Sequence, residues 1–215
     1  MTLLDAFDNL AAGDSLILLK SAHVHPDYGL LLRDVLGEVG DLLGTDIEMR
    51  YASNICTILI ASPRRVTPYH MDNAYNFLMQ VHGTKTFYVF DGTDPEILSP
   101  FELEQFWSGD GSAACYSEAK QKKAQEFALS AGSGVHVPIA YPHWAQNGSE
   151  VSVAVSINFK PVRNMAADMF RLNAKLRRLG LNPTPPGRSK VLDASKLVGL
   201  RTITSVKQAV KRALH

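Results

Sequence analysis

The sequence predicts a mostly β protein, a compact β-sandwich or barrel with helices at both ends. Three observations lead to this fold class. Short apolar segments, rich in β-branched and aromatic residues, fill the middle of the 215-residue chain. Glycine and proline turn signals separate these segments. The stretches with helical spacing lie before and after them, as flanking helices of a β domain would.

The first half of the chain is expected to alternate between helices and strands. Gly13 and Gly44 are the predicted helix ends, and Asn54 and Gly83 are the predicted turns between strands. The expected elements are a helix over 3–12, a strand over 15–20, a helix from Leu30 to Leu43, two strands over 47–62, and strands over 74–91.

The second half begins with an irregular surface insertion and ends with helices. The Pro-rich stretch 182–187 is predicted to be a stiff linker, dividing the chain into 1–181 and 182–215. The expected elements are one short helix within 92–126, strands and turns over 126–159, a helix over 163–180 with an apolar face, and a basic amphipathic helix over about 202–214.

Charge is unevenly distributed along the chain, whose formal net charge is +1. Residues 188–215 carry seven Lys/Arg against one acid, whereas the remainder carries 15 against 20. The overall balance argues against a wholly basic nucleic-acid binder, and a solvated charged helix is the expected role of the tail, so neither nucleic acid nor membrane is an expected partner.

The cysteine pattern and the N-terminus bear on the compartment. Cys56 and Cys115 form no C-x-x-C pair and are expected to be reduced thiols. The first residues lack a basic stretch before a long apolar run, and no segment approaches about 18 uninterrupted apolar residues. We therefore expect a cytoplasmic protein without a signal peptide or membrane span.

The stretch TPYHMDNAYNFLMQVHGTK contains a His-x-Asp pair, His70 and Asp72. Residues i and i+2 of a strand share a face, so both side chains are expected to converge on one point, as two ligands of one metal must. His25 and Asp27 have the same spacing, but Asp27 is expected to cap the following helix. The spacing alone therefore decides nothing, and the surroundings favour His70 and Asp72.

A third metal ligand is required, and the candidates are His82, His136 and His143. His143 follows a proline and precedes a strand pair, a suitable place for a rigid ligand at a barrel rim. Two histidines and one carboxylate leave coordination positions open and suit non-haem Fe(II). The alternative is that His70 and His143 are hydrogen-bonded core histidines.

Lys85 begins a strand that is otherwise apolar on its inward face. Lysine usually points outward to water, which is one interpretation. In the other, its ammonium points into the barrel, where it would be costly without an anionic partner. An inward lysine beside an iron site suits a dicarboxylate such as 2-oxoglutarate, with one end on the metal and the other on the lysine.

Several motifs in order resemble the JmjC, or cupin-like, family of 2-oxoglutarate- and Fe(II)-dependent oxygenases, with a pattern nearest its asparaginyl hydroxylases. They are Thr-Pro-x-His-x-Asp, Asn-Phe-x-x-Gln-x-x-Gly-x-Lys, Pro-x-x-x-x-His-x-x-x-Asn and a strand ending in Asn-Phe, within roughly residues 55–160. The resemblance implies a double-stranded β-helix, the jelly-roll or cupin barrel, formed within the expected domain 1–181. It also implies hydroxylation with release of succinate and CO2.

The resemblance implies a role for each matching residue. His70, Asp72 and His143 match the metal ligands, and Lys85 matches the lysine that binds the distal carboxylate of 2-oxoglutarate. Thr67 matches a threonine at the same carboxylate; alternatively it is a turn residue before Pro68. Matches to asparagines near the co-substrate and the metal fall on Asn76 and Asn158, for which strand-end hydrogen bonding is the alternative.

The expected partners are 2-oxoglutarate, dioxygen and an unidentified substrate, either a protein or peptide side chain or a small metabolite. One rival function is a cupin-type metalloenzyme that does not use 2-oxoglutarate. Another is a catalytically inert metal-binding module that acts through protein contacts. For the C-terminal helices, covering the protein's own core and forming a homodimer are competing roles.

Overall fold

A computed structural model describes residues 3–44 and 51–199 of the chain. The chain divides into two compact units. One unit comprises Met1–Ile97 with Cys115–Val162, and the other comprises Leu98–Ala114 with Arg163–His215. The first unit holds all the described strands, so the β domain expected from the sequence is this unit.

In the described part of the first unit, nine strands form two antiparallel sheets. The larger sheet has the order β1-β2-β9-β4-β7 and the smaller has the order β3-β8-β5-β6. The strands are β1 (Leu16–Leu19), β2 (Tyr51–Ala61), β3 (Val66–His70), β4 (Tyr75–His82), β5 (Lys85–Val89), β6 (Gln125–Leu129), β7 (Gly134–Val137), β8 (His143–Asn147) and β9 (Ser152–Pro161).

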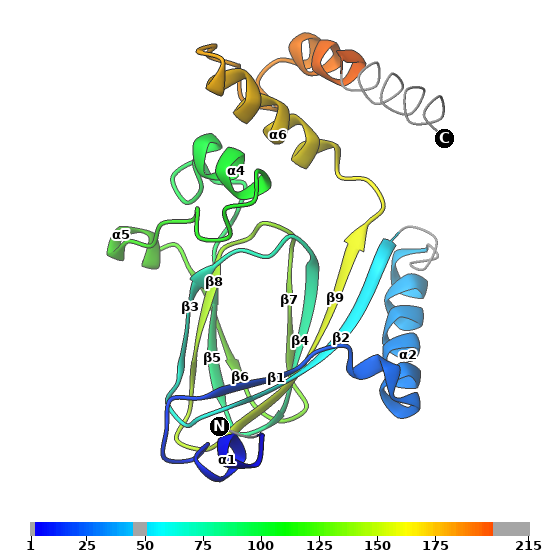
Figure 1. Cartoon of the computed structure of the whole chain (residues 1–215), viewed down its shortest axis with the longest axis vertical. Coiled ribbons are helices and arrows are strands. Elements are labelled where there is room, and N and C mark those ends of the chain that lie inside the picture. The colour runs from blue at the N-terminus through cyan, green and yellow to red at the C-terminus, as the bar shows by residue number, and fades with distance from the viewer. Residues whose placement is uncertain (1–2, 45–50, 200–215) are drawn as a thin grey trace. The chain divides into compact units, whose positions relative to one another are not determined.

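From β2 to β9 the chain passes repeatedly between the two sheets, which face each other around a common interior (Figure 1). The turn between β4 and β5 is one such crossing, since the two strands belong to different sheets. This topology is that of a jelly roll, a mostly β fold with flanking helices, and it confirms the fold class predicted from the sequence. The predicted turn at Gly83 is confirmed by its φ of 70°.

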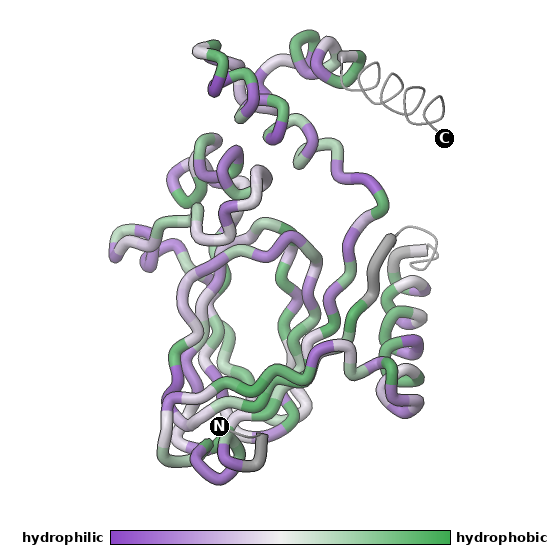
Figure 2. The backbone as a smooth tube through the Cα atoms, in the orientation of Figure 1, coloured by the Kyte–Doolittle hydropathy of each residue, from purple (hydrophilic) through white to green (hydrophobic). Residues whose placement is uncertain are grey.

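The core between the sheets is made by side chains that alternate inward along each strand. On β5, for example, Lys85, Phe87 and Val89 are buried and the residues between them are not. The buried residues of this cluster are Leu78, Phe87, Val89, Leu129, Val135, Val137, Ala145 and Ala154. Figure 2 shows the hydrophobic character of β1, which closes this interior at one edge of the larger sheet.

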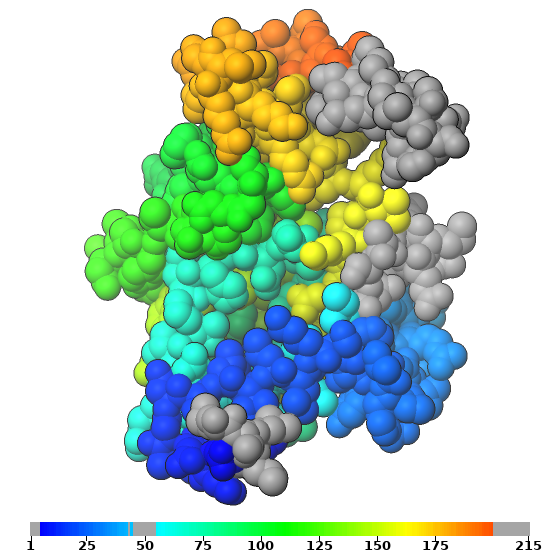
Figure 3. Space-filling view, in the orientation of Figure 1, coloured from blue at the N-terminus to red at the C-terminus, as the bar shows by residue number. Residues whose placement is uncertain are grey.

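The outer face of the larger sheet is covered by α2 (Pro26–Leu43), where Leu32 and Leu36 pack against β2 and β9. Green and purple segments alternate along this helix in Figure 2, as expected when one side is apolar. The helix ends at Gly44, as predicted, and Gly44 adopts the left-handed conformation. In Figure 3 the N-terminal residues, in blue, form a band from α1 (Leu3–Asp8) and β1 to α2 over one face of the unit.

Three expectations from the sequence are corrected. Residues 51–61 form one strand, because Asn54 pairs with Phe159 in a continuous ladder with β9 and makes no turn. Asp27 does not cap α2: it lies in the first turn, and His25 is the N-cap residue without a side-chain bond. The insertion over 92–126 contains two short helices, α4 (Pro100–Trp107) and α5 (Glu118–Gln121), where one was expected.

The second unit contains α4 and α6 (Met165–Arg178), which pack against each other. The guanidinium of Arg177 donates to both carboxylate oxygens of Glu104, which is fully buried, at 2.8 and 3.1 Å. The buried residues of α6 are Ala167, Asn173 and Ala174. The apolar side chains of Met165, at the start of the helix, and Leu179, directly after it, are exposed. The predicted helix over 163–180 is thus confirmed, but the expected apolar face is not the most buried one.

The Pro-rich segment 182–187 also belongs to the second unit, where the side-chain nitrogen of Asn173 donates to the backbone oxygen of Thr184 at 3.1 Å. Residues 190–199 are helical, which the sequence did not lead us to expect. The helix predicted over 202–214 lies outside the described residues, and the domain division at residue 181 stays a prediction. No helix within 3–44 or 51–199 combines the length and apolar character needed to cross a membrane.

Candidate metal centre and its cavity

Two strands of the smaller sheet bring together the histidines that the sequence singled out. His70 ends β3 and His143 begins β8, and the two residues are direct partners in the antiparallel ladder. Their ring centroids are 4.2 Å apart. Asp72 follows the end of β3 and places a carboxylate oxygen 3.7 Å from Nε2 of His143. The potential ligand atoms of His70, Asp72 and His143 all lie within 4.8 Å of one another, as binding of a single metal ion requires.

Backbone carbonyls orient both imidazole rings. Nδ1 of His70 lies 2.7 Å from the backbone oxygen of Pro68, and Nδ1 of His143 lies 2.9 Å from that of Tyr141. A carbonyl only accepts hydrogen bonds, so each Nδ1 carries a proton, and in the neutral form of either ring the lone pair is on Nε2. This is the arrangement in which metal-binding histidines are held.

The electrostatics also favour a cation at this position. Burial, and secondarily the neighbouring His70, lowers the pKa of His143 to about 4, an effect that Asp72 partly opposes. His143 is therefore neutral at neutral pH, as ligation requires. Its Nε2 lone pair then faces the Asp72 carboxylate, so two acceptors stand 3.7 Å apart. A cation between them would relieve this repulsion.

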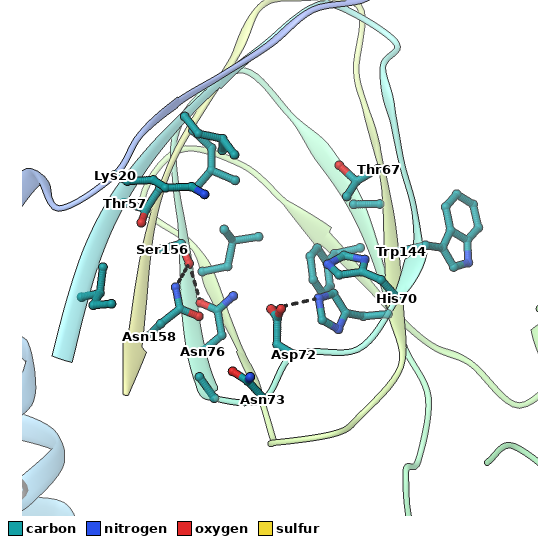
Figure 4. Close-up of a pocket in the computed structure, with 18 of the residues that line it drawn as sticks. Lys20, Thr57, Thr67, His70, Asp72, Asn73, Asn76, Trp144, Ser156 and Asn158 are labelled. Atoms are coloured by element: carbon teal, nitrogen blue, oxygen red, sulfur yellow. Dashed lines mark hydrogen bonds and ion pairs between the residues drawn. The ribbon is translucent and has the colours of Figure 1, made fainter. Parts of the chain in front are cut away.

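The three side chains line one wall of a cavity of about 450 Å³ between the two sheets (Figure 4). Thr67, Lys85, Asn76 and Asn158, the other site residues predicted from the sequence, line it as well. The structure therefore brings all seven predicted residues to one cavity, with contributions from both sheets.

Lys85 points into the barrel and not to solvent, because only 7% of it is exposed. Burial lowers the pKa of its ammonium to about 8. Among the described residues the ammonium has no hydrogen-bond or ion-pair partner. Burying a lysine ammonium without a counter-ion costs free energy, so an anionic group bound at this position would stabilise it.

Across the cavity, Asn76 and Asn158 are direct partners on β4 and β9. The hydroxyl of Ser156 joins them: it donates to Oδ1 of Asn76 at 2.9 Å and accepts from Nδ2 of Asn158 at 2.8 Å. Figure 4 shows the amide nitrogen of Asn76 pointing toward Asp72. The two asparagines are thus fixed side chains of the cavity wall.

Sequence reasoning missed several polar residues that line the cavity, which are Lys20, Ser21, Thr57, Asn73, Ser156 and Lys160. Ser156 was recognisable, since it precedes Asn158 by two residues on a strand and must share its face. Lys20 and Thr57 gave no comparable signal, because β1 and β2 read as apolar strands whose inward face is unknown until they pair.

The other candidate histidines lie elsewhere. His82 is exposed at the end of β4, and His136 lies on the outer face of β7, with its ring centroid 4.8 Å from that of Phe77. Trp144 lines the cavity, and its ring stacks on that of Tyr88 with centroids 4.3 Å apart and extends away from the metal ligands in Figure 4. Neither His25 nor Asp27, the pair with the same spacing, lines the cavity.

Comparisons with known proteins agree with this architecture. Residues 49–165, more than half of the chain, match the family described as "Cupin-like domain". Among solved structures, that of E. coli ycfD has a TM-score of 0.50 and 16% sequence identity, with 88% of this chain and 48% of that chain covered. The chain thus spans about half the length of that protein, and the likeness concerns the fold.

Other solved structures match less of the chain. The DMSP lyase DddQ from Ruegeria pomeroyi matches with a TM-score of 0.34 and 12% identity, covering 52% of this chain and 41% of that chain. The cupin domain of Drosophila melanogaster CENP-C matches with a TM-score of 0.33 and 12% identity, covering 48% and 59%. A search among curated protein sequences finds no match to this chain.

Proposed function

The chain belongs to the family of cupin-like domains, and from this premise we propose that it is an Fe(II)- and 2-oxoglutarate-dependent oxygenase. Its reaction would hydroxylate a protein or peptide side chain, or a small metabolite, and release succinate and CO2. The observation that carries the proposal is the ammonium of the buried Lys85, which has no partner among the described residues and lies in the same cavity as His70, Asp72 and His143.

Two imidazoles and a carboxylate form the donor set that non-haem Fe(II) uses when coordination positions must stay open. His70 and His143 would bind through Nε2, which their bonds to backbone carbonyls leave free. Asp72 would supply an oxygen ligand and one negative charge. The bound iron would supply the reaction with dioxygen, coupled to decarboxylation of the co-substrate.

Lys85 and Thr67 would hold the distal carboxylate of 2-oxoglutarate. Thr67 and Phe87 both pair with Ala145, one on each side of β8, and Lys85 lies one inward position further along β5. A hydroxyl and an ammonium therefore face the cavity beyond the metal ligands. A charge-assisted hydrogen bond from Lys85 would recover part of the desolvation that lowers its pKa to about 8.

Asn76 and Asn158 would act on the opposite side of the cavity. Their bonds to Ser156 leave the Nδ2 group of Asn76 as a donor directed toward the metal ligands (Figure 4). Leu78 and Phe87 supply apolar surface between the polar groups and help to exclude water from the reacting centre.

An anaerobic titration tests the proposal. The purified protein is titrated with Fe(II) and then with 2-oxoglutarate, and the visible metal-to-ligand charge-transfer band is recorded. We expect the band with the wild-type chain, its absence in His70→Ala, and a large rise in the 2-oxoglutarate concentration required in Lys85→Met. Lys175→Met, at an exposed lysine of α6, is the matched control and should behave as wild type.

The alternatives give different outcomes in the same titration. Iron binding without any response to 2-oxoglutarate would indicate a cupin-type metalloenzyme that does not use this co-substrate. A folded protein that takes up neither ligand would indicate an inert interaction module, and either result would refute the proposed activity.

A further inference from the structure

The cavity wall opposite the metal ligands holds a polar group that the proposed chemistry does not use. The β1–β2 ladder ends with Leu19 opposite Ile58, and extending its register by one residue sets Lys20, which directly follows β1, opposite Thr57. Thr57 in turn pairs with Ser156 on β9. Lys20, Thr57 and Ser156 therefore form one row, which runs from the residue after β1 across β2 to β9, and all three line the cavity.

Two members of this row have no partner in the described part of the chain. The hydroxyl of Ser156 is engaged by Asn76 and Asn158. No bond is formed by the ammonium of Lys20 or the hydroxyl of Thr57. Figure 4 shows the Lys20 ammonium extending toward the cavity. Lys20 is exposed and Thr57 is half-buried, so a solvent-accessible cation and a hydroxyl group both line the side of the cavity across from the metal ligands.

The charged residues that line the cavity are also unequal in number, with more lysines than acids. Its lysines are Lys20, Lys85 and Lys160, and its one described acidic residue is Asp72. The lining therefore carries two excess positive charges. A divalent metal and a doubly negative 2-oxoglutarate add no net charge, so loading the site would leave this excess in place. Because Lys85 is assigned to the co-substrate, the excess belongs to Lys20 and Lys160, the lysines of the larger sheet.

We infer that the substrate carries an anionic group, a carboxylate or a phosphate, which Lys20 and Thr57 bind opposite His70, Asp72 and His143. This inference rests on the proposed function and narrows its substrate class. Lys20 fixes the orientation of the substrate by holding this group at the wall of the larger sheet. The bond to be oxidised is then presented to the metal side of the cavity.

A binding experiment on the loaded protein tests this inference without requiring turnover. The full chain is prepared with Mn(II) and saturating 2-oxoglutarate, and paramagnetic broadening of probe resonances reports their binding. The probes are N-acetyl-aspartate N-methylamide, the corresponding asparagine compound, which differs by one charge, and inorganic phosphate. We expect the aspartate probe to bind at least about tenfold more tightly than the asparagine probe, the contribution of one charge-assisted hydrogen bond.

Three variants test whether Lys20 and Thr57 cause the preference for the aspartate probe. Lys20→Met should remove the discrimination between the aspartate and asparagine probes and leave the dissociation constant of 2-oxoglutarate within about twofold of wild type. The charge is kept in Lys20→Arg, which should retain the discrimination. Thr57→Val should weaken binding of the aspartate probe by a few-fold, as loss of one neutral hydrogen bond would. The control Lys175→Met should match wild type.

Stronger binding of phosphate than of the aspartate probe would identify a phosphate-bearing substrate, and the reverse order would identify a carboxylate; both support the inference. Equal binding of the two amino-acid probes to wild type, or discrimination that survives Lys20→Met, would overturn it. Loss of 2-oxoglutarate binding in Lys20→Met would also overturn it, by assigning Lys20 to the co-substrate.

If the wild-type chain binds no 2-oxoglutarate, the proposed function is wrong, but the anion site at Lys20 and Thr57 can still be tested. The lining has the same excess positive charge without the co-substrate, so the comparison of probes is then made with Mn(II) alone. Discrimination that depends on Lys20 would support an anion site in a different metalloprotein.

Discussion

His70 and His143 are direct cross-strand partners, and their ring centroids lie 4.2 Å apart although the residues are distant in sequence. Antiparallel pairing of β3 and β8 thus brings the histidines of two separate sequence motifs together as potential ligands of one metal ion. Because the rings are fixed by the carbonyls of Pro68 and Tyr141, their Nε2 atoms are oriented before any metal binds. Such preorganisation favours tight binding at low entropic cost.

Removal of a proposed metal ligand should abolish activity without unfolding the protein. We expect His70→Ala or Asp72→Ala to lose bound iron and to form no succinate above background, because each would leave two of three ligands. Iron content and succinate release are measured on the same samples. Full turnover in either purified variant would exclude this centre.

The pair His25 and Asp27 offers a control with identical spacing. Both side chains are exposed, at 63% and 83%, and neither lines the cavity. His25→Ala and Asp27→Ala should therefore retain iron binding and succinate release at the wild-type level. A loss of iron in these variants equal to that in His70→Ala would show that the assay does not report on the cavity.

Lys85→Met should stabilise the metal-free protein while weakening 2-oxoglutarate binding. Burial lowers the Lys85 pKa from 10.5 to about 8, so below pH 8 the folded state bears a penalty on the order of 3 kcal/mol. Between pH 8 and 10.5 the unfolded state holds the proton that the folded state has lost, so wild-type stability should rise with pH there.

Urea unfolding at pH 7.5 and pH 9.5 measures both effects. We expect Lys85→Met to raise the free energy of unfolding at pH 7.5 by about 2–3 kcal/mol and to flatten the increase toward pH 9.5. A variant less stable than wild type at pH 7.5, with an unchanged pH dependence, would show that Lys85 is not buried as an unpaired cation.

Ser156→Ala should disturb the wall formed by Asn76 and Asn158. The variant removes a donor to Asn76, which is only 7% exposed, and an acceptor for Asn158, so we expect a loss of about 1–2 kcal/mol in the free energy of unfolding. Thermal unfolding measures it. Ser149→Ala, at an exposed serine, should change stability by less than about 0.5 kcal/mol.

Gly83 and Gly37 should respond oppositely to replacement by alanine. Gly83 has φ of 70°, and a Cβ there would lie 2.5 Å from the backbone oxygen of Val151, so Gly83→Ala should cost more than about 2 kcal/mol. Gly37 lies within α2 with nothing within 4 Å of its Cβ position, so Gly37→Ala should stabilise by about 0.5–1 kcal/mol. Chemical denaturation of the two variants compares them, and similar effects would contradict the described turn.

The sequence by itself determined the β class of the middle of the chain, and its resemblance to a known family implied seven site residues, all of which line the cavity. The β class could be predicted locally, because period-two alternation fixes which residues of a strand share a face, as for Phe87 with Val89. Asp72 lies beyond the end of β3, so strand alternation does not place it beside His70. The end of the helix at Gly44 was also predicted from the local sequence, because glycine is the residue that most often occupies the left-handed position after a helix.

The tertiary structure decided everything that depends on pairing between distant strands. Asn54 was expected to turn, but its ladder with β9 satisfies its backbone and keeps β2 continuous. The choice of His143 over His136 follows from which face of β7 and β8 meets the interior. Lys20 became a cavity residue only when β1 aligned it with Thr57. Such contacts join segments far apart in sequence, and short-range patterns carry no information on them.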